Sequence, residues 1–435
     1  MQNLLTNLSK VLPNNDEFKV FYVQSKPTYI KSPVHFSSRD PNKPQTVKIR
    51  HFLQLIDHND VVLLGIEIFI YIQLYKGSVE QFVFVSKCDT VGSTKTEFRV
   101  GEIFKVFLTW LIQRDISAYN IKQSISHKEE NEKQTKIHNL ESIVGKLNDP
   151  SYYSSIPYYN EVPTNLKKSH RQPLAIPEQL TTKLVLFTRA ADQYLYPNSH
   201  KNKQKHILNG VQLLKWWIKV IDSTVTNEWI CKLCTPGHPT QSTAKFIEGT
   251  KNSWEVGHLY TPTTNRAVYT VPLFPDDPKG RFLEHLIVEN RYGDVSVQQF
   301  YEELGYRQEF LLGELVGLIG CQLQHKDPRP VETAATSEGL TLVTIQQYKQ
   351  IINLLKGEDY TITSDVQLLV KVKIPELMRR NSISGTVYHK IKGTKVKSEA
   401  KRSAEAASIV VNTLAVKRRT KPKPTNLNHL VRKKK

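Results

Sequence analysis

Short runs of apolar residues, several of them alternating with polar ones, occupy the chain between residues 45 and 90. Such runs predict neighbouring β-strands, here Lys48–Leu55, Val61–Tyr75 and Gln81–Ser86. The middle run is too short to cross a bilayer and contains Glu67, so it predicts a buried strand or strand pair and not a membrane segment. From Val100 to Ile112 the apolar positions recur every three to four residues, which predicts a helix packed on this sheet.

The pattern resumes after residue 178. Thr182–Thr188 predicts a strand, and Asn209–Val225 predicts a helix with Asn209 as its N-cap. This helix is apolar nearly all round, so we expect it to be deeply buried or to line a cavity. Ala267–Phe274 predicts another strand, and four further segments predict helices: Gly280–Glu289, Val295–Gly305, Thr344–Leu355 and Ser398–Leu414. Because strands and helices interleave, we expect an α/β fold with a mixed central sheet flanked by helices.

Breaks in the pattern divide the chain into five parts. Residues 1–120 and 179–325 form the two parts of the expected core, and residues 121–178 form a polar, then tyrosine-rich and proline-containing excursion between them. Residues 326–390 form an accessory region that begins with a linker. Residues 391–435 form a basic tail that we expect to be largely disordered.

The positive charge is concentrated in that tail. The chain carries a formal charge of +19, and residues 391–435 hold 14 Lys or Arg residues against two Asp or Glu residues. Such a tail suits an acidic partner, nucleic acid or a nuclear import receptor. No secretory signal pattern occupies the first eighteen residues, and the chain has four cysteines, so we expect an intracellular, reducing location. Cys231 and Cys234 with His238 could be half of a zinc site, but no second ligand pair follows, and no metal is predicted.

Two carboxylates and a lysine occupy a proline-braced turn at Leu273–Gly280, namely Asp276, Asp277 and Lys279. Because each proline fixes φ and lacks an N–H group, Asp276 and Asp277 cannot lie inside a helix or a central strand. The turn is therefore a candidate acid/base site, although the same residues also suit an ordinary structural turn. Adjacent residues in an extended corner point to different sides, so we expect one carboxylate to face a substrate.

Four segments together resemble one family: Phe84–Thr90, Leu186–Leu195, His206–Gly210 through Trp217, and the Asp276–Asp277 corner. The family is the fungal regulator-of-Ty1-transposition histone acetyltransferases, whose core resembles that of the metazoan coactivator acetyltransferases. The resemblance covers residues 45–120 and 180–320. It implies an enzyme that transfers acetyl from acetyl-CoA to histone H3 lysines, lysine 56 and amino-terminal lysines, in chromatin assembly and genome stability.

The resemblance also implies the roles of individual residues. A lysine amine is neutral in only about one molecule in 2,500 at pH 7, so the reaction needs a group that takes or orients its proton. The implied catalytic residues are Asp277, with Asp276 in support, Trp217 in a lysine tunnel, and Tyr194. The implied acetyl-CoA contacts are Cys88, Asp89, Thr90, Glu97, Phe98, Arg99, Val100, Gly101, Phe187, Ala191, His206, Ile207, Leu208 and Trp217. Without the resemblance, the aromatic residues Phe187, Tyr194 and Trp217 would suit ordinary packing in a hydrophobic core equally well.

The family acetylates its own equivalent of Lys279, and the alternative for this residue is a surface cation that balances the carboxylates. The implied partners are histone H3 with H4, an anti-silencing-function chaperone and a nucleosome-assembly-protein type chaperone, in the nucleus and without a membrane. An acidic chaperone would screen the repulsion between a basic enzyme and basic histones. Two alternatives remain: a basic chromatin or nucleic-acid binding protein without catalysis, and a small-molecule acetyltransferase.

Overall fold

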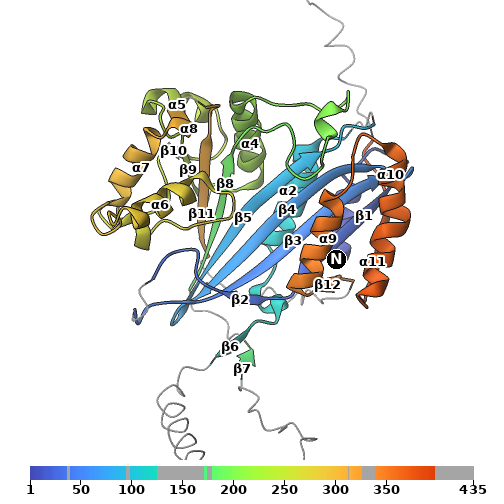
Figure 1. The fold of residues 1–435 in the computed structure, drawn as a ribbon, viewed down its shortest axis with the longest axis horizontal. Helices are drawn as coiled ribbons and strands as arrows, with labels where there is room; N and C mark the ends of the chain where they lie inside the picture. The colour runs from blue at the N-terminus through green and yellow to red at the C-terminus, as the bar shows by residue number, and fades with distance from the viewer. Residues whose placement is uncertain are drawn as a thin grey trace, which may run out of the picture. The chain divides into compact units, whose positions relative to one another are not determined.

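A mixed β-sheet runs through the compact unit Met1–Lys395 of the computed structural model (Figure 1). The structure describes residues 1–36, 40–94, 98–124, 171–173, 179–311, 313–325 and 339–396. Among these residues the sheet has the order β10-β9-β11-β8-β5-β4-β3-β1-β12, with β13 paired to β1 and β2 to β3. Its strands are β1 Glu17–Ser25, β2 Thr28–Ile30, β3 Gln45–Asp57, β4 Val62–Leu74, β5 Ser78–Thr90, β8 Gln179–Thr188, β9 Ile230–Cys234, β10 Trp254–Val256, β11 Gly317–His325, β12 Leu342–Val343 and β13 His389–Lys392.

The centre of the sheet consists of the three strands predicted from the apolar runs; β3 and β5 are longer than their runs, and β4 is one residue shorter at each end. β3, β4 and β5 pair antiparallel, whereas β5 and β8 pair parallel, with Phe84 opposite Val185. Every residue of β4 is buried because helices or loops cover both faces of the sheet there. The parallel pairing places the carboxyl ends of β5 and β8 next to each other. A separate two-stranded pair joins β6 Lys122–Ser124 to β7 Arg171–Pro173.

Helices α1, α2, α4 and α5 pack on one face of the sheet. They span Gln2–Ser9, Val100–Ile112, Gly210–Thr224 and Thr240–Ile247. Their buried side chains share a core with alternate strand residues such as Val83, Val85, Leu184 and Leu186. The short 3-10 helix η1 Ile116–Tyr119 follows α2, and Ile116 and Tyr119 join the same core.

The intervening strand residues face the other side, where two groups of helices lie (Figure 1). α9 Ile345–Lys356, α10 Thr363–Leu368, the π-helical turn η6 Leu369–Lys373 and α11 Ile374–Arg380 cover the β1 and β3 side. α6 Pro278–Val288, α7 Val297–Gly305 and α8 Gln308–Leu311 cover the β8 and β11 side. Among the described helices, none combines the length and the apolar character needed to cross a membrane.

Helix α4 begins as predicted but is less buried than predicted. The Asn209 side chain accepts from the backbone of Gln212, and the Gln212 side chain returns a bond to Asn209, which forms a capping box. The prediction of a helix buried all round was wrong, because Val211, Lys215 and Lys219 form a solvent-exposed side. α4 is thus an ordinary amphipathic helix with one face on the sheet.

The predicted strand at Ala267–Phe274 was also wrong. The 3-10 helix η5 Ala267–Tyr269 and a loop occupy this segment. Pro272 and Pro275 cannot donate to a strand ladder, so the apolar side chains of Val271 and Phe274 are buried without strand pairing. An apolar run therefore predicted burial here but not backbone geometry.

The other predicted elements divide into confirmed, missed and untested ones. The helix at Val100–Ile112 is confirmed with the same bounds, and the helices at Gly280–Glu289, Val295–Gly305 and Thr344–Leu355 are confirmed within a few residues. Order in the accessory region was underestimated, because α10 to α11 are helical and β12 and β13 extend the sheet. The helix predicted at Ser398–Leu414, most of the excursion and most of the tail lie outside the described residues.

Candidate active site

The Asp276–Asp277 corner places its two carboxylates in different environments. Asp276 adopts a left-handed φ of 59°, and its side chain is 71% exposed and forms an ion pair with Lys87 at 3.3 Å. Asp277 is buried and is the N-cap of α6, with Pro278 as the first helical residue. Only the Asp277 carboxylate is therefore buried, and the prediction that one of the two faces a substrate stays a prediction.

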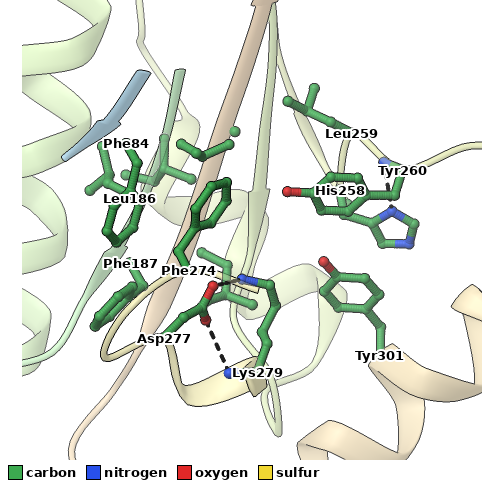
Figure 2. A pocket seen from close by; sticks show the side chains of 15 residues that line it. Phe84, Leu186, Phe187, His258, Leu259, Tyr260, Phe274, Asp277, Lys279 and Tyr301 are labelled. Carbon is green, nitrogen blue, oxygen red and sulfur yellow. Dashed lines mark hydrogen bonds and ion pairs between the residues drawn. The ribbon is translucent and has the colours of Figure 1, made fainter. Parts of the chain in front are cut away.

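Lys279 pairs with Asp277 inside the protein (Figure 2). Its backbone N–H donates to Asp277 Oδ1 at 3.0 Å, and its ammonium donates to Oδ2 of the same carboxylate. Both residues are buried, with 6% and 5% of their surface exposed. Lys279 is therefore not the surface cation that was one of the two alternatives, and the pair is a buried ion pair whose charges compensate each other.

An apolar pocket opens onto this pair (Figure 2). Its walls come from strands, loops and the helices α6 and α7, namely Phe84, Val185, Leu186, Phe187, Gly257, His258, Leu259, Tyr260, Phe274, Asp277, Lys279, Tyr301, Leu318, Ile319 and Gly320. Burial raises the pKa of both the Tyr260 and Tyr301 hydroxyls, so they stay protonated donors at neutral pH. The pocket thus combines an apolar wall with one carboxylate and two phenols, the composition of a ligand site.

Sequence reasoning missed the aromatic wall opposite Asp277. Burial lowers the pKa of His258 to about 4, and its ring stacks on Tyr301 with centroids 4.1 Å apart. His258 and Tyr260 lie on a loop after β10 without any periodic pattern, and Tyr301 lies on the packed face of α7. The Gly257–Tyr260 cluster of aromatic residues next to a glycine was the only available signal.

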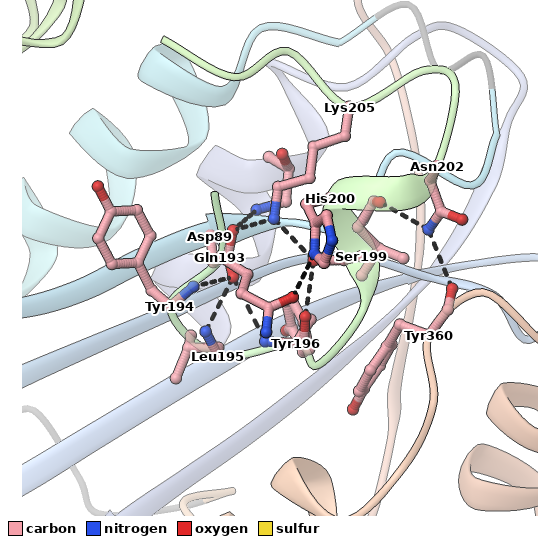
Figure 3. A network of polar contacts seen from close by, with 12 residues as sticks. Asp89, Gln193, Tyr194, Leu195, Tyr196, Ser199, His200, Asn202, Lys205 and Tyr360 are labelled. Atoms are coloured by element: carbon pink, nitrogen blue, oxygen red, sulfur yellow. Dashed lines mark hydrogen bonds and ion pairs between the residues drawn. The ribbon is translucent and has the colours of Figure 1, made fainter. Parts of the chain in front are cut away.

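Asp89 fastens the segment after β8 to the end of β5 (Figure 3). Its Oδ2 accepts backbone N–H groups of Tyr194 and Leu195, both at 2.8 Å, and of Tyr196 at 3.3 Å. Its Oδ1 accepts the Lys205 ammonium at 2.8 Å. The two stretches predicted to contact acetyl-CoA, residues 88–101 and 187–208, are therefore brought together at the carboxyl ends of two neighbouring parallel strands.

Uncompensated polar groups lie at this edge of the sheet. The buried hydroxyls of Ser93 and Thr94 have no hydrogen-bond partner in the part of the chain that the structure describes. The N-cap of α2, Arg99, is exposed, and its side chain makes no capping bond. Free donors and a helix N-terminus suit the amide and phosphate oxygens of a CoA molecule, so these residues fit such a ligand.

The remaining predicted cofactor residues surround the same edge. Ala191, His206 and Ile207 are exposed, and Leu208 is half-buried. The half-buried Tyr194 donates its hydroxyl hydrogen to the Arg189 carbonyl, and burial raises its pKa to about 12. Cys88 is half-buried, and its thiol pKa is raised by burial. Phe98, Val100 and Gly101 begin or precede α2, and Glu97 lies outside the described residues.

A row of aromatic rings connects this edge to the Asp277 pocket. The Phe187 ring stacks on Phe84 with centroids 6.2 Å apart, and Phe84 stacks on Phe274 at 4.7 Å. Phe274 lies three residues before Asp277. The predicted cofactor residue Phe187 and the predicted catalytic residue Asp277 thus line one pocket.

Trp217 does not take part in that pocket. Its buried ring contacts Phe104 of α2 edge-on at 4.8 Å and belongs to the core under α1, α2 and α4. That core lies on the sheet face opposite Phe84 and Phe274. Trp217 is not among the residues that line the Asp277 pocket, and its expected place in a lysine tunnel stays a prediction.

The cysteines are not grouped with other possible metal ligands in the described part of the chain. Cys231 and Cys321 are buried and lie directly opposite each other on β9 and β11. Cys234 is half-buried, and burial raises its pKa to about 12. Within the described ranges, no three His, Cys, Asp or Glu side chains are grouped as metal ligands.

Comparisons with known proteins point in one direction. The family described as the histone acetyltransferase KAT11-type domain matches residues 4–376. The histone acetyltransferase RTT109 of Candida albicans is 43% identical over 361 residues, which cover 82% of this chain and 96% of that protein. Its namesake from Schizosaccharomyces pombe is 34% identical over 168 residues, covering 34% of this chain and 42% of that protein.

The fold agrees with the sequence comparison. The crystal structure of Rtt109 from Aspergillus fumigatus superposes with a TM-score of 0.62 and covers 91% of this chain and all of that one, at 20% identity. The mixed α/β fold predicted from the sequence is therefore confirmed. The chain belongs to the KAT11-type Rtt109 family, and it is a histone lysine acetyltransferase.

Proposed function

We propose that this acetyltransferase acts on histone H3 lysines, lysine 56 and amino-terminal lysines, with acetyl-CoA as the acetyl donor and Asp277 as the group that receives or orients the amine proton. The observation that carries this proposal is the pocket in which Asp277 and Phe187 both lie. One wall of the pocket belongs to the strand edge that suits CoA, and the other holds the only carboxylate among its lining residues.

Asp277 is suited to take a proton by its position. It is fixed by its role as N-cap of α6, so its carboxylate keeps one orientation. Acetyl-CoA, when bound, supplies a thioester from which the acetyl group passes to the amine. Asp277 Oδ2 would accept a proton from that amine as the amine attacks the thioester carbon and CoA leaves as its thiolate, and the apolar walls exclude water that would hydrolyse the thioester.

The residues that would hold the donor are those at the carboxyl ends of β5 and β8. Ser93 and Thr94 offer hydroxyls without partners, and the α2 N-terminus offers backbone N–H groups for a phosphate. Exposed Ile207 and Val211 offer apolar surface beside them for the pantetheine arm. Arg99 is the single basic side chain of residues 97–101, so the helix terminus would provide much of the phosphate contact.

Lys279 is proposed to be acetylated by the enzyme itself. At present its ammonium occupies Asp277 Oδ2, the oxygen that the substrate amine needs. Acetylation would remove the positive charge and release that oxygen, and it would also remove the cost of burying an ammonium. Mass spectrometry of active protein should find acetyl-Lys279, and a fully active preparation without it would contradict this role.

The test of the overall proposal is an acetylation assay with acetyl-CoA and histone H3–H4, with and without an acidic histone chaperone. Site-resolved mass spectrometry should find acetyl groups on H3 lysine 56 and on amino-terminal lysines. Acetylation confined to H4 would overturn the proposed substrate, even though the enzyme class would stand.

We also propose that histone H3–H4 is delivered to the enzyme in the nucleus by chaperones of the anti-silencing-function and nucleosome-assembly-protein types. Enzyme and histone are both basic, so an acidic carrier would reduce their repulsion. We assign the basic tail, residues 391–435, to the anti-silencing-function chaperone. A pull-down with the tail deleted that retains this chaperone at full affinity would reject the assignment.

Tail deletion also tests the alternative of a chromatin-binding protein whose tail performs the function. Family membership argues against a protein without catalysis, and the truncated protein should keep its acetyl-CoA binding and its intrinsic turnover. A full-length protein that binds chromatin without acetylating it, and that loses this binding upon deletion, would favour the alternative.

A further inference from the structure

The surface formed by α6 and α7 differs in charge from the rest of the chain. Residues 276–309 contain eight Asp or Glu residues and four Lys or Arg residues, whereas the whole chain has a formal charge of +19. Glu284, Glu289, Asp294 and Glu302 are exposed there. A net acidic surface on a basic protein suits a basic partner through charge complementarity.

Apolar side chains are exposed on the same surface. Val288 is 85% exposed, Tyr306 78% and Ile287 43%. Val288 and Tyr306 are the two most exposed large apolar side chains in the described part of the chain. Exposed aromatic and aliphatic anchors with charged neighbours are the usual composition of a protein interaction site.

Polar contacts join these residues into one continuous surface. Arg307, the neighbour of Tyr306, donates to His285 Nδ1 at 3.0 Å, and His285 lies one helical turn before Val288. Arg291 bridges Glu303 of α7 at 2.9 Å and Glu289, directly after α6, at 3.5 Å. Phe282 and Phe300 stack between the helices with centroids 5.1 Å apart, and Figure 1 shows α6 and α7 side by side.

This surface also lies at a defined distance from Asp277. Asp277 caps the N-terminus of α6 and Val288 is its last residue. At a rise of about 1.5 Å per residue the helix separates the two by about 16 Å. An extended peptide covers that distance with about five residues. A chain whose lysine reaches Asp277 could therefore contact Val288 about five residues away.

We propose that the acidic surface containing Ile287, Val288 and Tyr306 is the docking site for the basic histone substrate, in the region flanking the acceptor lysine. Val288 and Tyr306 bury apolar side chains of the histone, while the surrounding carboxylates bind its lysines and arginines. This proposal depends on the proposed role of Asp277 only for the spacing of about five residues between the acceptor lysine and the docked part of the histone.

The test uses the full chain with Val288→Ser and Tyr306→Ala combined. The KM for histone H3–H4 should rise about 10-fold with kcat unchanged, because these contacts hold substrate before and during the reaction alike. Fluorescence anisotropy with labelled H3–H4 should show the same loss of affinity without any need for catalysis. A lysine peptide with fewer than five residues on either side should react as with the wild type.

A matched control is the double variant Ile362→Ala with Leu368→Ser. These two side chains are 45% and 47% exposed at α10, in the other group of helices on the same face of the sheet. Equal KM values for the two double variants would overturn the proposal. Glu284→Lys with Glu302→Lys should weaken histone binding about threefold to tenfold at low salt and less at high salt. No change at low salt would contradict the charge argument.

Sedimentation at several protein concentrations distinguishes the other occupant, a second copy of this chain. A wild-type dimer that Val288→Ser with Tyr306→Ala converts to a monomer would overturn histone docking. A monomer throughout, with the KM effect present, would support it. Failure of Asp277→Asn to slow turnover would leave the anisotropy result intact, so this site and the catalytic site are tested separately.

Discussion

The two buried lysine–aspartate pairs, Asp89–Lys205 and Asp277–Lys279, differ in the other groups that each carboxylate binds. Asp89 accepts four backbone N–H groups in addition to the Lys205 ammonium, counting its own neighbour Thr90 at 2.9 Å. Asp277 accepts only the backbone and the ammonium of Lys279 among the described groups. The hydrogen-bond acceptor sites of the Asp89 carboxylate are therefore all occupied, whereas the Asp277 carboxylate can accept further hydrogen bonds.

This difference separates a structural role from a chemical one. A saturated carboxylate cannot take a substrate proton without breaking the bonds that hold the segment after β8. A carboxylate with few partners, facing an apolar pocket, can exchange one partner for another. Burial and a lysine partner alone would not have distinguished the two sites.

The largest effect is expected for Asp277→Asn. Asparagine can still cap α6 but cannot accept a proton as a carboxylate does. We expect turnover to fall by about 10² to 10⁴ with acetyl-CoA affinity nearly unchanged. Stability should fall moderately, because the asparagine oxygen can still accept from the buried Lys279 ammonium but no longer balances its charge. Steady-state kinetics and isothermal titration with acetyl-CoA check this. A fall of less than about threefold in turnover would remove Asp277 from the chemistry.

Asp89→Ala should show the opposite profile. The change leaves the Lys205 ammonium buried, with only 5% of its side chain exposed, without its carboxylate, and it leaves several N–H groups unpaired. We expect a loss of about 3 to 5 kcal/mol in the free energy of unfolding. Urea denaturation measures this loss, and acetyl-CoA affinity should fall with it. A fully stable Asp89→Ala protein would show that the network is not structural.

Lys48 extends the comparison to a buried lysine without a carboxylate partner among the described residues. Its ammonium lies 3.9 Å from the centre of the Phe69 ring, and burial, helped by the Arg50 charge, lowers its pKa from 10.5 to about 7. The folded protein therefore binds this proton less tightly than the unfolded chain. The destabilisation is complete below pH 7 and disappears as the pH rises towards 10.5.

Lys48→Met should accordingly stabilise the protein by about 2 kcal/mol at pH 6. The advantage over the wild type should shrink steadily between pH 7 and pH 9.5. Thermal melts of both proteins across this range measure the difference. An advantage that does not depend on pH would mean that packing, and not charge burial, is responsible.

Asp276→Asn should have the smallest effect and is the control for Asp277→Asn. Asparagine tolerates the left-handed φ of 59°, and the ion pair with Lys87 is exposed on the Asp276 side. We expect a change in stability of less than about 0.5 kcal/mol. A turnover loss as large as that of Asp277→Asn would show that the two carboxylates act as a unit.

The sequence predicted the parts of the molecule in which local chemistry and tertiary packing agree. The apolar runs of β3 to β5, the 3.6-residue period of α2 and the Asn209 cap each specify their own geometry. The Asp276–Asp277 corner was identified because prolines restrict the backbone on both sides. The same prolines explain the error at Ala267–Phe274, since burial was correct there and strand pairing was impossible.

The parts that were not predicted depend on contacts between distant residues. Asp89 was expected to contact the cofactor, and its clamp on Tyr194 to Tyr196 depends on the parallel pairing of β5 with β8. Trp217 was assigned to the lysine tunnel by resemblance, yet which side of the sheet α4 covers is decided by packing against α2. His258 and Tyr301 reach the pocket from different elements, so no pattern within either segment could reveal them.

The short pair β6–β7 has a consequence for how this enzyme tolerates changes in length. Lys122 lies opposite Pro173, so the two ends of the stretch between β6 and β7 are held side by side. Residues can be added or removed between these strands without moving the register of β8. Doubling such a stretch costs only about 0.6 kcal/mol in closure entropy. Fusion tags or reporter peptides inserted there should leave the catalytic core undisturbed.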